Sequence, residues 1–229
     1  MKFIDIHTHI LYGIDDGAKT EAESKEMLTL ARADGTDTFI FTPHCTSEEF
    51  DTEKVRAVAA SLCDTPLVGC EVLYRGAGTA EMLKSGRIPT LAGSDCVLVE
   101  FGFGVDIATL LKAVHEITSL GLTPIIAHPE RYRLITAKDV GALIDAGALI
   151  QLNADSVMGK NGFSVKLKSA AILKAEFAHF IASDCHDTKG RTPVLSRCFD
   201  TVSKKYGAEY AEELFYGNAN YFILNNRGN

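Results

Sequence analysis

The sequence lacks long apolar runs and clusters of basic residues. No run of 18 or more apolar residues occurs among its 229 residues, so no transmembrane helix is expected. The opening segment MKFIDIHTH lacks the basic, apolar and small-residue regions of a secretory signal. The formal net charge is -7, and Lys and Arg do not gather in one segment, which argues against a nucleic-acid-binding surface. We therefore expect a cytoplasmic protein that neither inserts into a membrane nor binds nucleic acid.

The six cysteines do not form a CxxC pair, which argues against a zinc knuckle and against a disulfide framework. Most of them are expected to be small buried hydrophobic residues. Cys185 requires separate consideration, because Cys185 to Thr192 has the C-x5-R-T spacing of cysteine-dependent phosphatases. However, Asp187 in that loop would repel a phosphate, and His186 is better explained as a metal ligand. A cysteine nucleophile is therefore the minor alternative.

Apolar segments of strand length alternate with helical patterns throughout the chain, which is typical of parallel βα units. The expected strands are 3–7, 38–42, 67–72, 97–101, 123–127, 149–153 and 177–183. No linker, internal repeat or Gly-rich dinucleotide-binding fingerprint occurs. The pattern predicts one α/β domain over residues 1–229, folded as a distorted TIM-like barrel of the (β/α)7 type, with a doubly wound open sheet as the alternative.

Several residues indicate where the intervening helices begin and end. Thr20 with Glu23 has the pattern of a capping box, and Thr136 with Asp139 resembles one. Glycines are found where helix C-termini are expected, at Gly35, Gly121 and Gly147. Apolar residues between 107 and 117 keep helical spacing on one face. The segment 76–94 is the least regular, and we expect a short helix near 80–84 and a small strand near 88–91.

Nearly every expected strand ends in a residue that can bind a metal ion. In a barrel such strand ends meet at one mouth, where catalytic residues are found. Asp15 and Asp16 follow shortly after the first strand. Five of the seven histidines are at these positions, and His115 and His179 are expected to have no special role. The strand-end candidates are His7, His9, His44, Glu71, Glu100, His128, Asp184 and His186.

The combination of histidine and carboxylate favours a divalent ion such as zinc, manganese or iron. Side chains alternate along an extended strand, so His7 and His9 point to the same side and could chelate one ion. Glu71 and Glu100 could bridge ions, which favours a cluster of several metals. Their charge, with that of Asp15 and Asp184, would not neutralise three divalent ions, so the cavity would suit a phosphate.

Two arginines strengthen the expectation of a phosphate site. Arg131 follows His128 in HPER, and Arg191 follows His186 in SDCHDTKGR, so both lie in loops that leave the same mouth. Arginine makes bidentate contacts with phosphate oxygens.

The segments DIHTHILYGIDDGAKT, FIFTPH, VLVEF, IIAHPERY and IASDCHD resemble the polymerase and histidinol phosphatase (PHP) superfamily. More narrowly, they resemble its bacterial tyrosine-protein phosphatases of capsule and exopolysaccharide synthesis. The resemblance spans His7 to Arg191. It implies a PHP barrel with three divalent ions, usually manganese, with iron or zinc as alternatives. By position, the metal ligands carried over are His7, His9, His44, Glu71, Glu100, His128, Asp184 and His186.

The resemblance also implies the roles of the remaining site residues and the reaction. Arg131 and Arg191 would contact phosphate, and Asp15, in preference to Asp16, would lie near the metals. Metal-activated hydroxide would hydrolyse phosphotyrosine in a protein substrate, a bacterial tyrosine kinase of polysaccharide export, and so regulate capsule synthesis. The alternatives are another PHP phosphomonoesterase, such as histidinol phosphatase, or a non-catalytic PHP module, which should lack ligands.

This sequence departs from the family pattern at three places. Cys70 precedes Glu71, Asp187 stands where asparagine is usual, and Arg-Thr-Pro follows the SDCHD segment. Glu71 is the carried-over ligand whose flanking residues match the pattern least well.

Overall fold

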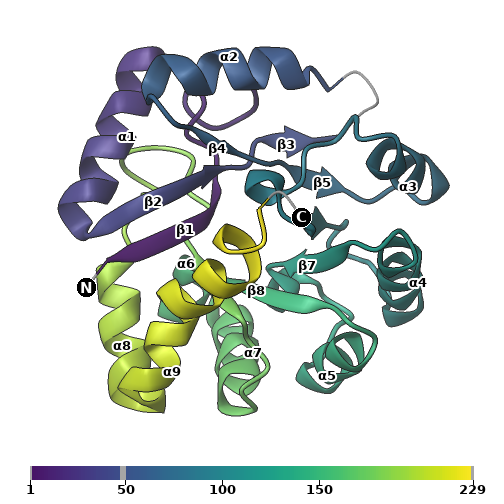
Figure 1. Cartoon of the computed structure of the whole chain (residues 1–229). Coiled ribbons are helices and arrows are strands. Elements are labelled where there is room, and N and C mark those ends of the chain that lie inside the picture. Colours follow the sequence, from purple (N-terminus) through teal and green to yellow (C-terminus); the bar gives the residue numbers. More distant parts are fainter. Residues whose placement is uncertain (1, 47–49, 228–229) are drawn as a thin grey trace.

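The computed structural model describes residues 2–46 and 50–227. Every strand pairing among them is parallel. Figure 1 shows the strands at the centre, with helices around them. The strands are β1 (Phe3–Thr8), β2 (Thr36–Phe41), β3 (His44–Cys45), β4 (Leu67–Val68), β5 (Glu71–Leu73), β6 (Cys96–Glu100), β7 (Thr123–Ala127), β8 (Leu149–Asn153) and β9 (Phe180–Ala182).

The strands form two sheets, β1-β2-β4 and β3-β5-β6-β7-β8-β9. These sheets are continuous in space, because β3 extends the path of β2 and β5 extends that of β4. Across the two interruptions, Gly69 N donates to Phe41 O and Glu71 N donates to Pro43 O. The ring closes between its first and last strands, where Thr8 forms a parallel bridge with Cys185. The predicted distorted (β/α)7 barrel is confirmed.

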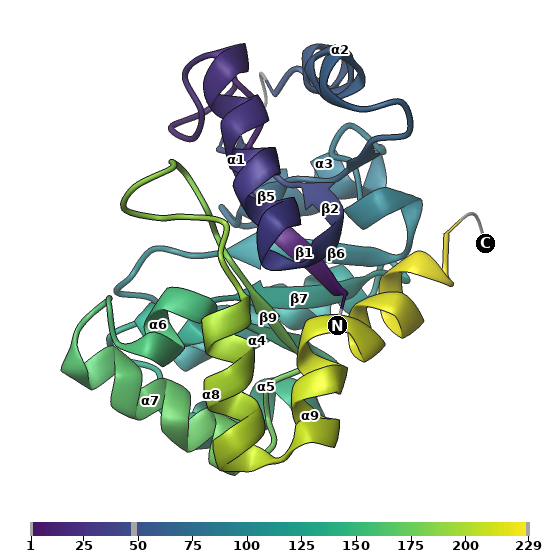
Figure 2. The same cartoon turned by 90° about the vertical axis from the view of Figure 1, so that its left-hand side faces the viewer.

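The helices cover the outside of the barrel (Figures 1 and 2). The α5 helix begins with the full capping box of Thr136 and Asp139. At the start of α1, Thr20 accepts from Glu23 N, but the Glu23 carboxylate accepts from Lys19 N instead of from Thr20. The helices are α1 (Glu21–Asp34), α2 (Thr52–Leu62), α3 (Ala77–Lys84), α4 (Ile107–Thr118), α5 (Ala137–Asp145), α6 (Ala154–Met158), α7 (Phe163–Lys174), α8 (Ser196–Tyr206) and α9 (Ala208–Glu212).

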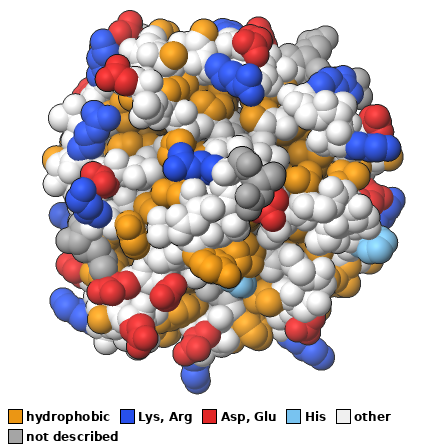
Figure 3. All heavy atoms as spheres, viewed as in Figure 1, with side chains coloured by type: hydrophobic (Ala, Val, Ile, Leu, Met, Phe, Trp, Pro, Cys, Tyr) orange, Lys and Arg blue, Asp and Glu red, His pale blue; other side chains and the backbone are white. Residues whose placement is uncertain are grey.

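The C-terminal segment covers the end of the barrel at which the strands begin. It continues from α9 through two π-helical turns, η3 (Glu213–Gly217) and η4 (Asn220–Leu224), and is drawn in yellow across the strands in Figure 1. Ala219 and Ile223 pack into the buried cluster that contains Ile4 and Leu149. Acidic, basic and apolar side chains are interspersed on this face (Figure 3). The opposite end, where the strands finish, carries the polar residues.

Two details of the expected strands are wrong. The strand predicted at 67–72 is interrupted at Gly69, because this residue packs so closely on Leu91 that a Cβ would lie 2.6 Å from the leucine side chain. The small strand predicted near 88–91 is absent. That segment contains Pro89, which has no N–H for a ladder, and it leads into the 3-10 turn η1 (Leu91–Gly93), where Ala92 has a φ of 54°.

The remaining boundaries agree with the expected pattern in outline. Gly35 is the left-handed C-cap of α1, whereas Gly121 and Gly147 lie just beyond the caps of α4 and α5. The last strand is shorter than expected, and the short strand β3 was not expected. No helix in the described ranges has the length and apolar character needed to span a membrane.

Candidate active site

All eight predicted metal ligands lie together at the mouth where the strands end. Their donor atoms form four overlapping groups, and within each group the atoms lie within 4.8 Å of one another. Shared residues connect the groups into one continuous cluster. The groups are His7, His9 and Asp184; His7, Glu71 and His128; His44, Glu71 and Glu100; and His9, Asp16, His44 and His186.

At the end of β1, the donor atoms of His7, His9 and Asp184 lie close enough together to share one metal ion, and Glu71 lies beside them. The Nε2 atoms of His7 and His9 lie 3.1 Å apart. Glu71 Oε2 lies 3.2 and 3.4 Å from these two nitrogens, and Asp184 Oδ1 lies 3.4 Å from each. Donors about 2.1 Å from a tetrahedral ion are about 3.4 Å apart. These separations therefore match a shared cation.

Glu71 is the centre of the cluster, because its two oxygens face different histidines. Oε2 also lies 2.9 Å from His44 Nδ1, while Oε1 lies 2.8 Å from His128 Nε2. Burial raises the pKa of Glu71, but the charge of His7 and the close contacts with His128 and His44 hold that pKa well below its usual range. A fully buried, ionised carboxylate in this position can bridge two cations.

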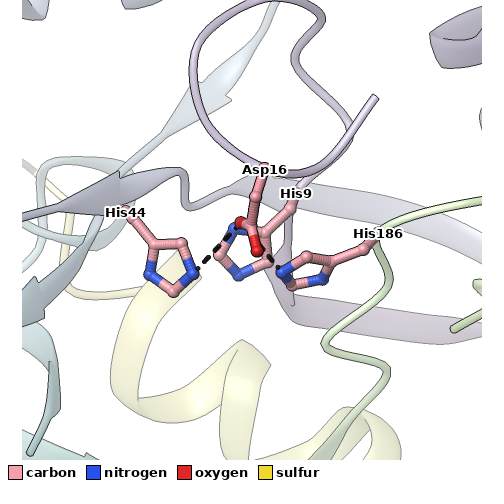
Figure 4. Close-up of side chains that lie close together, drawn as sticks. All are labelled: His9, Asp16, His44 and His186. Atoms are coloured by element: carbon pink, nitrogen blue, oxygen red, sulfur yellow. Dashed lines mark ion pairs between the residues drawn. The ribbon is translucent and has the colours of Figure 1, made fainter. Parts of the chain in front are cut away.

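A second part of the cluster is more accessible to solvent. The carboxylate of Asp16 lies between His44 and His186, with Oδ1 3.4 and 3.3 Å from their Nε2 atoms (Figure 4). The His9 ring lies beside both, at centroid distances of 4.4 and 4.0 Å. On the other side of His44, Glu100 Oε1 approaches Nδ1 to 3.2 Å. This part could hold further cations next to the first.

Asp15 and Asp16 have different positions. Asp15 Oδ2 lies 2.7 Å from His9 Nδ1 and accepts from His44 N, and Oδ1 accepts from Gly17 N. Asp15 thus holds the outer side of the His9 ring, and only the Asp16 carboxylate lies among the grouped donors. Gly17 allows this close loop, because a Cβ there would lie 2.0 Å from His9 O.

The buried polar atoms without a hydrogen bond support a cation at this place. In the described ranges, eight buried side-chain nitrogen or oxygen atoms lack a hydrogen bond of normal geometry, and five of them belong to the cluster. Such atoms are costly in a folded protein unless another partner satisfies them. Divalent cations would satisfy the four of these atoms that face other donors of the cluster, namely His44 Nδ1, Glu71 Oε2, Asp184 Oδ1 and His186 Nε2.

Two of the candidate ligands have an unusual backbone conformation. His128 has a φ of 35° and Asp184 a φ of 52°, values that few residues other than glycine adopt. Such conformations cost of order 1–3 kcal/mol each and concentrate at functional sites. The strain turns both side chains toward the mouth at the ends of β7 and β9.

Arg131 and Arg191 reach the same site from the loops after β7 and β9. Arg131 Nη1 donates to Asp184 Oδ2 at 3.3 Å, and Arg191 Nη2 lies 2.6 Å from the same oxygen. The Arg131 guanidinium also lies over the ring of Phe103, 4.9 Å from its centroid. Each guanidinium has five donors, so both retain donors for an anion. Their side chains are 26% and 40% exposed, which makes them accessible from the mouth.

Sequence reasoning missed two buried amides in β8. Gln151 Oε1 lies 3.0 Å from His7 Nδ1, and Asn153 Nδ2 donates to Asp184 Oδ2. The segment LIQLN places these polar residues at alternate positions of an otherwise apolar strand, so both point into the barrel. That alternation is the signal in the sequence that indicates them, although uncharged amides do not stand out as metal-site residues.

The remaining histidines and Cys185 lie outside the donor groups, as expected. His179 Nδ1 accepts a hydrogen bond from Ile150 N, and His115 is exposed on α4. Cys185 is completely buried, and its carbonyl accepts from His9 N. Burial raises the pKa of the Cys185 thiol well above its ordinary value, which disfavours a thiolate nucleophile.

Comparison with known proteins identifies the family. Residues 3–224 match the family model described as "Capsular polysaccharide synthesis, CpsB/CapC". The chain belongs to this family. It is 34% identical over 239 residues to the tyrosine-protein phosphatase CpsB of Streptococcus pneumoniae, covering 96% of this chain and 98% of that one. It is 32% identical over 219 residues to YwqE of Bacillus subtilis, which is also named a tyrosine-protein phosphatase. This match covers 90% of this chain and 86% of YwqE.

Solved structures agree with this membership of the CpsB/CapC family. The fold matches one from the work on YwqE of Bacillus subtilis and CpsB of Streptococcus pneumoniae, described there as unique metal-dependent tyrosine phosphatases. The TM-score is 0.89, with 29% identity over 98% of this chain and 95% of that chain. A D-hydantoinase from Thermus sp. is similar in fold alone, with a TM-score of 0.60 and 10% identity. The match covers 96% of this chain and 70% of the hydantoinase. The predicted resemblance to tyrosine phosphatases of capsule synthesis is therefore confirmed.

Proposed function

We propose that this CpsB/CapC family member is a metal-dependent protein-tyrosine phosphatase that uses the described cluster as its active site. The observation that carries the proposal is the convergence of eight histidine and carboxylate ligands beside two arginines. A site of this kind combines cation binding with phosphate binding. The named relatives are tyrosine-protein phosphatases and align over nearly the whole chain, which supports the same enzyme class here.

The four overlapping donor groups support a cluster of three divalent ions, and we favour manganese over iron or zinc. An imidazole-rich donor set is poorly matched to magnesium. The ligands would be the eight strand-end residues predicted from the sequence, and Asp16 is an additional candidate. When bound, the ions would supply Lewis acidity and lower the pKa of a coordinated water.

The protein residues around the cluster would bind and orient the substrate. Arg131 and Arg191 would contact phosphate oxygens and stabilise charge that develops on them. Asp184 Oδ2 orients both guanidinium groups, and Asp15 holds the His9 ring. The leaving group of phosphotyrosine is a phenolate, whose conjugate acid has a pKa of about 10. A strong general acid is therefore less necessary than for an alkyl phosphate.

For the substrate, we propose a phosphotyrosine protein of the cytoplasm, namely a bacterial tyrosine kinase of polysaccharide export. The family description, which refers to capsular polysaccharide synthesis, supports this choice. Dephosphorylation of such a kinase would regulate capsule synthesis. A non-catalytic role is disfavoured, because all the ligand types that the reaction requires are present.

Activity on a phosphotyrosine peptide tests the proposal against its closest alternative, a histidinol phosphatase. The manganese-loaded protein should hydrolyse the peptide with a much higher kcat/KM than histidinol phosphate. His128→Ala should abolish hydrolysis, while His115→Ala, a histidine substitution on the exposed face of α4, should leave it unchanged. A preference for histidinol phosphate would refute the tyrosine-phosphatase assignment, and equal activity of the His128→Ala variant would refute the active site.

A further inference from the structure

A chain of hydrogen bonds connects two of the candidate metal ligands through buried amides of β8. His7 Nδ1 lies 3.0 Å from Gln151 Oε1, and Gln151 Nε2 donates to Asn153 Oδ1 at 2.9 Å. Asn153 Nδ2 then donates to Asp184 Oδ2 at 2.5 Å. The exposed fractions of Gln151 and Asn153 are 0% and 2%, so solvent does not compete for these bonds.

The direction of every bond in this chain follows from its last member. The ionised Asp184 carboxylate only accepts, so the amide nitrogen of Asn153 must face it. The amide oxygen of Asn153 is then left to accept from Gln151 Nε2, which turns the Gln151 oxygen toward His7. That oxygen has no hydrogen to give, so His7 Nδ1 carries the proton. His7 Nε2 therefore presents its lone pair to the point shared with His9 and Asp184.

We propose that Gln151 and Asn153 form an amide relay that positions two metal ligands at once. Gln151 selects the His7 tautomer that can bind a cation through Nε2. Asn153 holds Oδ2 of Asp184, which leaves Oδ1 directed at the same cation. This proposal rests on the proposed function, because it assigns His7 and Asp184 to a metal ion.

The chemistry of the amide explains why a carboxylate does not occupy either position. A relay member must accept at one end and donate at the other, which an amide does and an ionised carboxylate cannot do. An aspartate at position 153 would place two carboxylates against each other. The relay itself is held by the strand, because Asn153 pairs with Ala182 of β9 and its backbone N donates to Glu130 Oε1.

Zinc affinity of the full-length protein tests the relay without reference to catalysis. Zn²⁺ is titrated against a chromophoric chelator for the wild type, Gln151→Leu, Asn153→Leu and the double variant. Each single substitution should weaken zinc binding about 10- to 100-fold, the usual effect of removing a partner of a metal ligand. The two amides act as one unit. The zinc affinity of the double variant should therefore be no lower than that of the single variant with the lower affinity. Asn218→Leu, which removes an amide bonded to His179 O, is the matched control and should leave zinc affinity unchanged.

Nitrogen NMR of ¹⁵N-histidine-labelled, metal-free protein at alkaline pH, where no zinc ion fixes the tautomer, provides a second, structural measurement. The wild type should show His7 with Nδ1 protonated. Gln151→Glu keeps an acceptor at this position and should retain that tautomer, so it also serves if the leucine variants do not fold. Unchanged zinc affinity in folded Gln151→Leu, strictly additive losses, or a folded Gln151→Glu variant in which His7 Nδ1 is not protonated would overturn the relay.

His7→Ala separates this proposal from the proposed function. If His7→Ala loses zinc while Gln151→Leu keeps it, the relay is wrong and the metal site stands. If His7→Ala keeps wild-type zinc affinity, the metal assignment itself is wrong.

Discussion

Arg191 lies 2.6 Å from Oδ2 of Asp184, the oxygen that faces away from the histidines. Arg131 and Asn153 contact that oxygen as well, whereas Oδ1 faces His7 and His9. Burial raises the pKa of Asp184, but the charge of His7 and the close contact with His9 hold that pKa well below its usual range. One ionised carboxylate therefore connects the candidate metal cluster to Arg131 and Arg191, which together form the candidate phosphate clamp.

Removal of divalent metal should abolish phosphatase activity. In the cluster, the carboxylates and histidines leave polar atoms without partners, and the arginines alone offer no means of activating water. After chelation and dialysis, Mn²⁺ should restore activity more effectively than Mg²⁺, because imidazole is a poor ligand for magnesium. The measurement is hydrolysis of a phosphotyrosine peptide during a titration with each ion. Full activity after prolonged treatment with excess chelator would contradict the metal requirement.

The sequence predicted which histidines and carboxylates the fold would bring together, because that depends on residue type and on position at strand ends. His128 and Asp184 follow apolar strand segments, and parallel strands of a barrel end at one mouth. The structure brings both to the cluster. Their backbone strain could not be predicted, since it results from the loops that the whole barrel imposes. Their metal binding stays a prediction.

Features that depend on register and packing were not accessible from the pattern. The interruption at Gly69 results from contact with Leu91, a residue 22 positions later in the chain. The difference between Asp15 and Asp16 depends on how the loop folds over His9. Gln151 and Asn153 resemble ordinary polar residues until the register of β8 places them beside His7 and Asp184.

Replacement of Cys185 by serine should preserve most of the activity. The thiol is fully buried behind the cluster, and burial raises its pKa well above the ordinary value, so it supplies no thiolate at neutral pH. The measurement is kcat/KM on a phosphotyrosine peptide, together with metal content. A loss of about a thousandfold with metals still bound, the scale expected for a missing nucleophile, would support the cysteine mechanism instead.

Asp15 and Asp16 should contribute differently to stability. Asp15→Ala removes a buried acceptor from His9, His44 N and Gly17 N, and should lower the free energy of unfolding by about 2 kcal/mol. The side chain of Asp16 is 66% exposed, so Asp16→Ala should change stability by no more than about 0.5 kcal/mol. Urea unfolding of the metal-loaded variants measures both values. Equal destabilisation would show that Asp15 does not position His9.

His179 should make the protein less stable as the pH falls. Burial lowers the pKa of His179 in the folded state, and Nδ1 must stay unprotonated to accept from Ile150 N. Below the unfolded pKa of about 6.5, the unfolded chain therefore binds more protons than the native chain, and stability decreases until the folded pKa is reached. His179→Asn keeps an acceptor that does not titrate. It should reduce the loss of urea stability between pH 7.5 and 5.5.

The control for this experiment is His115→Asn, which changes an exposed histidine. Acid release of metal affects the wild type and both variants alike. The comparison is therefore between the slopes of their unfolding free energies against pH. A slope of His179→Asn identical to that of the wild type would contradict the prediction.

Arg131→Ala and Arg191→Ala should each reduce turnover about a hundredfold. This corresponds to an increase of roughly 2.7 kcal/mol in the activation free energy, the usual effect of losing one preorganised charge contact. Metal content should remain close to that of the wild type, because a guanidinium cannot bind a cation and Asp184 Oδ2 keeps Asn153 and the other arginine as partners. Arg56→Ala is the matched control, because it removes an exposed arginine of α2 together with its ion pair to Glu53. It should have wild-type kinetics.

His128→Ala should behave differently from the arginine variants and lose both metal and activity, because its Nε2 approaches Glu71 Oε1 to 2.8 Å within the donor group. Steady-state kinetics and metal analysis on the same preparations make the comparison. An arginine variant with wild-type turnover would remove that residue from the phosphate clamp. An arginine variant that loses metal would show instead that its contact with Asp184 serves the metal site, and the division between clamp and ligands would then be wrong.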